Sequence, residues 1–165
     1  MRVLLKAIFA TALTICSGFV ISARAADTVV GAWRLVSLTE EETANKVVHK
    51  PLGKHPLGLI IFTAEGYMSF IMADPSRKAA AVPKATDAEA AALYRTMAAY
   101  SGKYRLDGDK LTNHPEIAWN HAWNGTDQYR IIAISGNTLT VTTTPFVSPF
   151  YGAEIVSVLA FEREP

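Results

Sequence analysis

The sequence predicts an all-β domain, an antiparallel up-and-down barrel of about 8–10 strands with one inserted helix. Three observations lead to this fold class. Apolar or alternating segments of strand length recur throughout residues 26–165, glycine-containing turns separate many of them, and one stretch has helical periodicity. Because hairpins rather than long crossovers join the strands, the segments form a meander that closes on itself and leaves no free edge.

The segment before this domain, residues 1–25, has the pattern of a secretory signal. Arg2 and Lys6 supply the positive start, residues 7–21 form the apolar run, and residues 23–25 (Ala-Arg-Ala) offer a small-x-small cleavage site. We therefore expect a mature domain of residues 26–165 that is periplasmic or secreted, without membrane contact after cleavage. An uncleaved anchor helix and lipidation at Cys16 are the alternatives. The short apolar run argues against the first, and the bulk of Ile15 argues against the second.

Cleavage changes the charge balance. The signal segment contains three positive residues and no acidic one, so its loss changes the formal net charge from +1 to −2. A nearly neutral domain lacks the basic surface that nucleic-acid binding requires and the polybasic cluster that attracts acidic lipids. Cys16 is the only cysteine, so the mature domain has no disulfide, no cysteine-ligated zinc and no cysteine nucleophile.

The strands can be assigned in chain order from their hydrophobic patterns. A polar turn at residues 40–45 follows the first strand, and hairpins with glycine in the turn are predicted at 64–66, 107–110 and 135–137. The nine predicted strands cover residues 29–38, 47–49, 58–63, 67–73, 100–106, 111–117, 127–134, 138–144 and 154–162.

Residues 86–99 interrupt this series with helical features. Thr86 and Glu89 have the spacing of a capping box, and Leu93 and Met97 are four residues apart. The pattern predicts an amphipathic helix of about three turns over residues 88–99. We interpret it as a lid or plug over one end of the barrel, and the alternative is a surface helix that only connects two strands.

Several short motifs follow one another in a typical order. The first strand carries Gly31-Ala32-Trp33, the Gly-x-Trp start of lipocalin and calycin barrels. It is followed by residues 51–63, Gly66-Tyr67, Gly102-Lys103-Tyr104, His114, residues 125–130, 139–143 and 161–163. The ordered set covers nearly all of the mature chain and resembles the lipocalin-like domain family of bacteria and fungi. The resemblance implies a barrel with an internal cavity, and it does not imply one activity.

The same resemblance assigns a structural role to Trp33. In such barrels this tryptophan packs at the closed end, with an arginine from a late strand stacked across the ring. Arg163 is the first candidate for the arginine and Arg130 the second. Burial of the ring and the cation–π contact, worth about 0.5–2 kcal/mol, would stabilise the closed end.

Five residues are predicted to bind a ligand inside the barrel: Tyr67, Tyr104, His114, Gln128 and Arg130. Tyr104 lies on the apolar face of its strand, and we expect His114 to face inward as well. His114 shares one face with Glu116, and the alternation of that strand leaves open whether this face is internal. The strand at 67–73 presents Met68, Phe70 and Met72 on one face, which suits either an apolar ligand or an ordinary core.

Two functions are compatible with these residues. The first is an exported protein that binds a small, mostly apolar or amphipathic molecule in the barrel cavity, without a cofactor. The alternative is a cavity enzyme that performs acid–base isomerisation, cyclisation or hydration, with His114, Glu116 and Tyr104 as catalytic candidates. A barrel filled by its own side chains is a third possibility. Oligomeric state is not predicted.

A metal site formed by His114, Glu116 and His121 was weighed against these functions. The three residue types are suitable ligands for a divalent metal. Pro115, however, disturbs the strand between the first two. We therefore expect no metal, and the ligand is expected to be an organic molecule.

Overall fold

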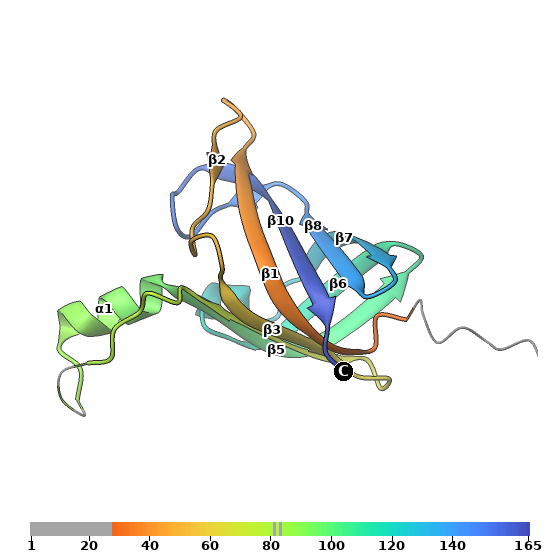
Figure 1. Ribbon diagram of the computed structural model, residues 1–165, viewed down its shortest axis with the longest axis horizontal. Coiled ribbons are helices and arrows are strands. Elements are labelled where there is room, and N and C mark those ends of the chain that lie inside the picture. The colour runs from red at the N-terminus through yellow and green to blue at the C-terminus, as the bar shows by residue number, and fades with distance from the viewer. Residues whose placement is uncertain (1–27, 81, 83) are drawn as a thin grey trace, which may run out of the picture.

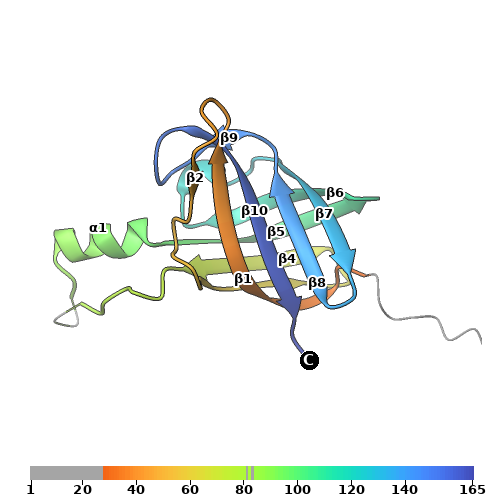
Figure 2. The same cartoon turned by 45° about the horizontal axis from the view of Figure 1, so that its top comes forward.

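The computed structural model describes residues 28–80, 82 and 84–165, so the predicted signal segment lies outside the described residues. Eight strands form one closed antiparallel barrel in the order β1-β3-β4-β5-β6-β7-β8-β10, and β10 returns to pair with β1 (Figures 1 and 2). This confirms the predicted fold class. The barrel strands are β1 (Gly31–Glu42), β3 (Leu57–Phe62), β4 (Tyr67–Ala73), β5 (Met97–Asp107), β6 (Lys110–Ala118), β7 (Gln128–Ser135), β8 (Thr138–Thr143) and β10 (Glu154–Arg163).

Two short strands extend the barrel at one end. Strand β2 (Val48–His49) pairs with Glu40 and Glu41 near the end of β1, and β9 (Phe146–Val147) pairs with the beginning of β10. The sequence predicted the first of these but not the second. Because β1 continues to Glu42, the polar turn begins later than predicted, and residues 40–42 belong to the barrel wall.

The barrel closes at Trp33, whose side chain is completely buried. Its indole Nε1 donates a hydrogen bond of 2.8 Å to the carbonyl of Val29, and the Arg163 guanidinium lies 3.9 Å from the ring centroid. Arg163 also donates hydrogen bonds to the carbonyls of Val30 and Thr28, at 2.9 and 2.7 Å. One arginine therefore joins the last strand, the tryptophan ring and the segment leading into β1, which seals this end of the barrel.

A β-bulge changes the orientation of the second half of β1. Leu35 pairs with Phe161 and Ser37 pairs with Ala160, so Val36 has no partner on β10. The buried positions consequently shift from Trp33 and Leu35 before the bulge to Leu38 and Glu40 after it. A bulge inserts one unpaired residue and reverses the inward and outward alternation beyond it. For this reason a glutamate enters the interior of the barrel.

A second bulge lies between β5 and β6. Ser101 pairs with Ile117 and Gly102 pairs with Pro115, which leaves Glu116 as the extra residue. The backbones approach so closely that a Cβ atom on Gly102 would lie 2.1 Å from the carbonyl oxygen of His114. Glycine is therefore required at position 102. Pro115 is accommodated at this irregularity because it has no N–H group to contribute to the ladder.

The inserted helix α1 (Asp87–Arg95) is shorter than predicted. Its N-terminus has the expected capping box between Thr86 and Glu89. Residues 97–99 instead begin β5 and pair with β4, because the ladder provides backbone partners that outweigh the helix propensity of these residues. None of the helix residues is buried or lines the internal cavity described below, and the helix extends away from the barrel (Figure 1), so it is a connecting surface helix and not a plug.

In the part of the chain that the structure describes, no helix has the length and apolar character needed to span a membrane.

The closed end gives a direct test of barrel stability. Trp33→Ala should lower the free energy of unfolding by about 3–5 kcal/mol, because it removes a large buried ring and the surface on which Arg163 stacks. Urea unfolding monitored by circular dichroism measures this loss. Ile117→Ala, at a side chain that is 75% exposed, is the control and should change stability by less than about 0.5 kcal/mol. A loss below about 1 kcal/mol for Trp33→Ala would contradict the central role of this residue.

Candidate ligand-binding cavity

The barrel encloses a cavity of about 360 Å³ beyond the core that packs on Trp33. This volume lies in the range of pockets that hold small organic molecules. Strands from around the whole barrel contribute its apolar wall, and the loops that follow β8 and η1 (His121–Trp123) contribute to its rim. The apolar and aromatic residues of the wall include Leu38, Ile60, Phe70, Met72, Tyr100, Leu111, Trp123, Val141, Phe146, Phe150, Leu159 and Phe161.

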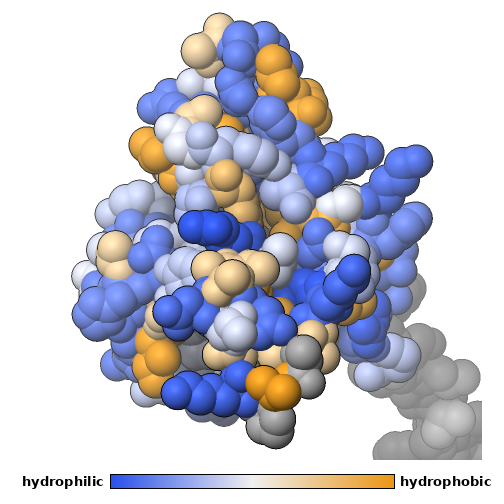
Figure 3. All heavy atoms as spheres, turned by 90° about the vertical axis from the view of Figure 1, so that its left-hand side faces the viewer, coloured by the Kyte–Doolittle hydropathy of each residue, from blue (hydrophilic) through white to orange (hydrophobic). Residues whose placement is uncertain are grey.

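The face of the molecule from which α1 projects is more hydrophilic than this wall. Figure 3 views the molecule from the side on which α1 projects and shows mainly hydrophilic residues with scattered apolar ones between them. The Met68, Phe70 and Met72 face of β4 is buried, and Phe70 and Met72 line the cavity. This face of β4 therefore supplies both core packing and cavity wall.

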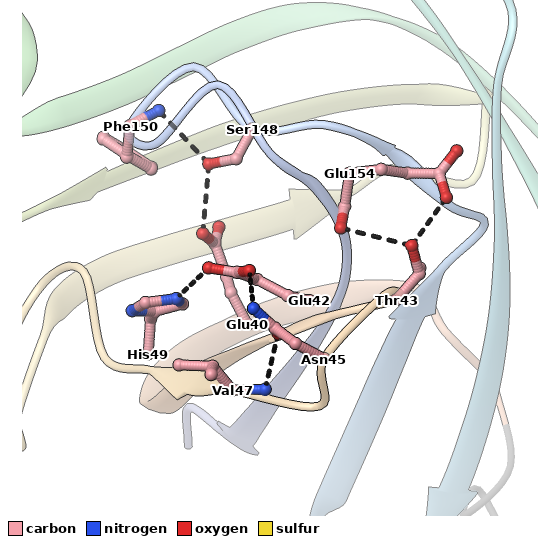
Figure 4. A network of polar contacts seen from close by, with 9 residues as sticks. All are labelled: Glu40, Glu42, Thr43, Asn45, Val47, His49, Ser148, Phe150 and Glu154. Carbon is pink, nitrogen blue, oxygen red and sulfur yellow. Dashed lines mark hydrogen bonds and ion pairs between the residues drawn. The ribbon is translucent and has the colours of Figure 1, made fainter.

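Glu40 is a polar group within the apolar wall. Its side chain is 2% exposed, and its carboxylate oxygens accept a hydrogen bond of 3.3 Å from Ser157 Oγ and one of 3.2 Å from Ser148 Oγ. Figure 4 shows the bond from Ser148. Within the described residues, no lysine, arginine or histidine forms an ion pair with it. Burial raises the pKa of Glu40, and the two serine hydroxyls and the more distant His49 offset this only in part.

Ser148 connects Glu40 to the loop between β9 and β10. Its hydroxyl also accepts a hydrogen bond from the backbone N–H of Phe150, at 3.2 Å, and Phe150 lines the cavity (Figure 4). The next residue, Tyr151, stacks on His49 with ring centroids 4.3 Å apart. The loop is therefore fixed at two points: Ser148 binds Glu40, and Tyr151 packs on β2.

Burial and hydrogen bonds around this loop shift the pKa values of two further ionisable groups. Burial and the nearby Glu40 charge raise the pKa of Tyr151 to about 12, so its hydroxyl is protonated at neutral pH. Hydrogen bonds from His49 and Asn45 lower the pKa of Glu42, whose carboxylate lies 2.7 Å from His49 Nε2. Two carboxyl groups on one strand therefore have opposite pKa shifts, because Glu40 is buried and Glu42 is hydrogen-bonded near the surface.

Asn113 is a second polar group inside the barrel. Its side chain is 1% exposed, and its Nδ2 donates a hydrogen bond of 3.2 Å to the hydroxyl of Tyr100. Its Oδ1 is buried and has no hydrogen-bond partner in the part of the chain that the structure describes. Exchanging the amide oxygen and nitrogen would leave the other atom without one, so either assignment leaves an unmet hydrogen-bonding group. A buried polar atom without a partner costs about 1–3 kcal/mol, and a ligand that bonds to it recovers this energy.

Gln128 and Arg130 also line the cavity, at the beginning of β7. Arg130 Nη2 donates to Gln128 Oε1, and Nη1 donates to the carbonyl of Tyr129, both at 2.8 Å. Within the described residues, Arg130 forms no ion pair with an acidic group. The structure thus brings these two predicted residues to the cavity, and their contact with a ligand stays a prediction.

The other predicted site residues lie elsewhere. His114 and Glu116 are on the outer surface, where His114 Nδ1 lies 2.8 Å from Asp127 Oδ1. The expectation that His114 faces inward is wrong, because Leu111, Asn113 and Pro115 occupy the inward positions of β6. Tyr67 is 47% exposed and also faces outward, next to Lys103 on β5.

Tyr104 faces the interior as expected, but it lies near the closed end. Its ring packs edge-on against Phe62 with centroids 5.0 Å apart, and its hydroxyl donates to the carbonyl of Thr63 at 2.8 Å. Burial and the nearby Glu65 charge raise the pKa of its hydroxyl. Tyr104 is absent from the cavity lining, so its position favours a structural contact rather than a catalytic one.

The structure does not bring together His114, Glu116 and His121, the three alternative metal ligands. His121 begins the turn η1, where its Nδ1 lies 3.4 Å from Asn124 Nδ2. Among residues 28–80, 82 and 84–165, no three histidine, cysteine or acidic side chains come together as a metal site would require.

Sequence reasoning missed Glu40 and Asn113. Glu40 was assigned to a polar turn because the bulge at Val36 has no clear sequence signal. The inward direction of Asn113 could have been predicted from the alternation of β6, since Asn113 shares a face with the strongly apolar Leu111. A polar residue at an inward position of an apolar strand was therefore the signal that could have found it.

A closed antiparallel barrel with one sealed end and a largely apolar cavity defines a class of small β-barrel proteins whose fold typically holds small molecules. A scan against protein-family models matches residues 30–163 to the lipocalin-like domain. The chain belongs to this lipocalin-like family, as the resemblance in the sequence indicated. No match was found among curated proteins.

The burial of Glu40 predicts a specific pH dependence of stability. A carboxyl group whose pKa is raised by folding stabilises the folded state at low pH, and this contribution is lost as the pH rises through the raised pKa. Glu40→Gln retains the shape without the charge. The stability of the variant relative to the wild type should therefore increase as the pH rises above about the ordinary value of 4.5.

Urea unfolding of both proteins at a series of pH values measures this difference. Glu41→Gln, on the outward face of the same strand next to Lys46, is the matched control. A difference between Glu40→Gln and the wild type that does not vary with pH would show that Glu40 does not titrate abnormally.

Proposed function

We propose that this protein is an exported binding protein that holds one small, largely apolar molecule with at least one hydrogen-bonding group. The observation that carries the proposal is the buried amide oxygen of Asn113, which has no hydrogen-bond partner among the described residues and belongs to the wall of the cavity. A cavity lined by hydrocarbon and aromatic groups gains most from an apolar ligand. The amide oxygen of Asn113 and the hydroxyl of Tyr100, as an acceptor and a donor, would orient a polar group on that ligand.

The space itself supports binding rather than a filled core. Protein interiors pack with few voids larger than a water molecule. The cavity of about 360 Å³ is much larger than such voids, and its wall contains polar atoms. The fold supports the same function, because lipocalin-like barrels typically bind small molecules.

The structure gives the enzymatic alternative no general base in the cavity among the predicted candidates. It required His114 and Glu116 to face the cavity, and both lie on the outer surface. Tyr104, the third catalytic candidate, is hydrogen-bonded to Thr63 away from the cavity. No observation on the described residues favours an acid–base reaction over binding, so binding is the function that we propose.

Filling the cavity tests this function. Ala98 is buried and lines the cavity, whereas Ala99 is the next residue on β5 and faces outward. Ala98→Phe should reduce the affinity for the uncharged fluorescent probe N-phenylnaphthylamine by about tenfold or more, which corresponds to about 1.4 kcal/mol. Ala99→Phe adds the same side chain outside the barrel and should leave the affinity unchanged. Equal affinity in both variants, with both proteins folded, would place the binding site elsewhere.

Export is a separate part of the proposal and has its own test. Protein recovered from its host should begin at Ala26, following cleavage after the Ala-Arg-Ala sequence of residues 23–25. Edman sequencing or intact-mass analysis measures the terminus. Ala25→Phe places a bulky residue at the cleavage position and should leave the signal attached. Recovery of the wild-type chain with Met1 in the membrane fraction would contradict the proposal.

A further inference from the structure

Glu40 has features that the binding of a purely apolar molecule does not explain. Two acidic residues line the cavity, Glu40 and Asp127. Asp127 is in hydrogen-bond contact with His114 and partly exposed, so solvent and this contact stabilise its charge. Glu40 is buried without an ion pair among the described residues. A buried acid of this kind requires either a proton or a cation from outside the protein.

The hydrogen bonds of Glu40 leave room for such a cation. A carboxylate has about four acceptor positions on its two oxygens. Ser148 and Ser157 occupy one position on each oxygen, at 3.2 and 3.3 Å. Both hydroxyls donate to the carboxylate, so they support its charged form and orient it within the cavity wall. The bond from Ser148 is drawn in Figure 4.

The cationic side chains among the described residues do not supply the missing charge. Arg130 lines the same cavity, but its guanidinium is bound to Gln128 and to the carbonyl of Tyr129. His49 acts on Glu40 only at a distance, because its Nε2 is directed at Glu42. The compensating positive charge therefore comes from a proton in the empty barrel or from a bound ligand.

The remaining wall suits an organic cation. Aromatic rings from several elements line the cavity, and the negative faces of such rings attract ammonium groups at distances below about 6 Å. The rings belong to Phe70, Tyr100, Trp123, Phe146, Phe150 and Phe161. The same rings also bury an apolar body, so one wall serves both parts of an amphipathic amine.

We propose that the cavity selects a protonated organic amine, with the ammonium group hydrogen-bonded to Glu40 and the apolar body packed against the aromatic wall. The inference rests on the proposed binding function and specifies the chemical class of its ligand. Asn113 and Tyr100 then bind a second polar group where the ligand has one. Ser148, which joins Glu40 to the loop containing Phe150, connects the charged end of the site to its aromatic wall.

Protonation provides an independent signature of this contact. In the empty barrel, burial raises the pKa of Glu40. A bound ammonium favours the ionised carboxylate, so lowering the pH through the raised pKa weakens amine binding. The other titratable or charged groups on this side are Glu42 on β1, His49 on β2, Asp127 and Arg130 at the start of β7 and Tyr151 in the β9–β10 loop. The Glu40→Gln variant keeps all of them, so it isolates the effect of Glu40.

A matched ligand series tests the proposal by isothermal titration calorimetry. Phenylbutylamine, phenylbutanol and phenylbutanoate share one apolar body and differ in the charge of the terminal group. The wild type should bind the amine at least about tenfold more tightly than either of the others, and this preference should decrease as the pH is lowered. Glu40→Gln should remove both the preference and its pH dependence. Glu41→Gln, the same substitution on the outward face of β1, should retain both.

The other outcomes show whether the amine proposal fails alone or the binding function fails with it. Equal binding of the amine and the alcohol, unchanged by Glu40→Gln, would overturn the amine proposal and leave the binding function intact. Tighter binding of the carboxylate would overturn it as well and point to Arg130 as the charged partner. If neither this series nor N-phenylnaphthylamine binds the wild type, the proposed function itself fails.

Discussion

The pairing between the first and last strands is the contact on which the cavity depends. Nine residue pairs from Trp33↔Arg163 to Glu42↔Ile155 join β1 and β10. Without this pairing the sheet would have two open edges and no interior. The pairing is between segments far apart in the chain, so it is formed at a large cost in loop entropy. Trp33 and Arg163 offset that cost with ring burial, a cation–π contact and hydrogen bonds to two carbonyls of the entering segment.

The sequence predicted those parts of the fold that local patterns control. Strand β4 has the predicted bounds of residues 67–73, because it is strictly alternating and begins after a glycine turn. The cap of α1 was predicted for a similar reason, since Thr86 and Glu89 are three residues apart and form hydrogen bonds to each other's backbone. The C-terminal end of the helix was not predicted. Residues 97–99 are good helix formers, and only the ladder with β4 makes them a strand.

The cavity was harder to predict than the barrel because a bulge in β1 controls which side chains of its second half enter the interior. The bulge at Val36 directs Glu40 inward, whereas Asn113 and His114 precede the bulge at Glu116 in β6 and follow ordinary alternation. Alternation has a period of two, so one unpaired residue reverses every assignment beyond it. Gln128 and Arg130 were located correctly because β7 begins at the cavity rim without such a shift. Glu40, by contrast, depends on contacts with Ser148 and Ser157 from distant parts of the chain, which no local pattern contains.

The bulge in β1 also has a consequence for how such a barrel changes over generations. Removing the single unpaired residue at Val36 would leave the nine pairs with β10 in register and would keep Leu38 and Glu40 in the interior. Losing a paired residue such as Thr39 would instead turn Glu40 outward and Glu41 inward, because alternation has a period of two. A codon can therefore be lost at the bulge without changing the cavity, whereas the same loss at a paired position replaces several cavity residues at once. A family of closed barrels can in this way vary strand length at its bulges and diversify its ligands through short deletions elsewhere in the strands.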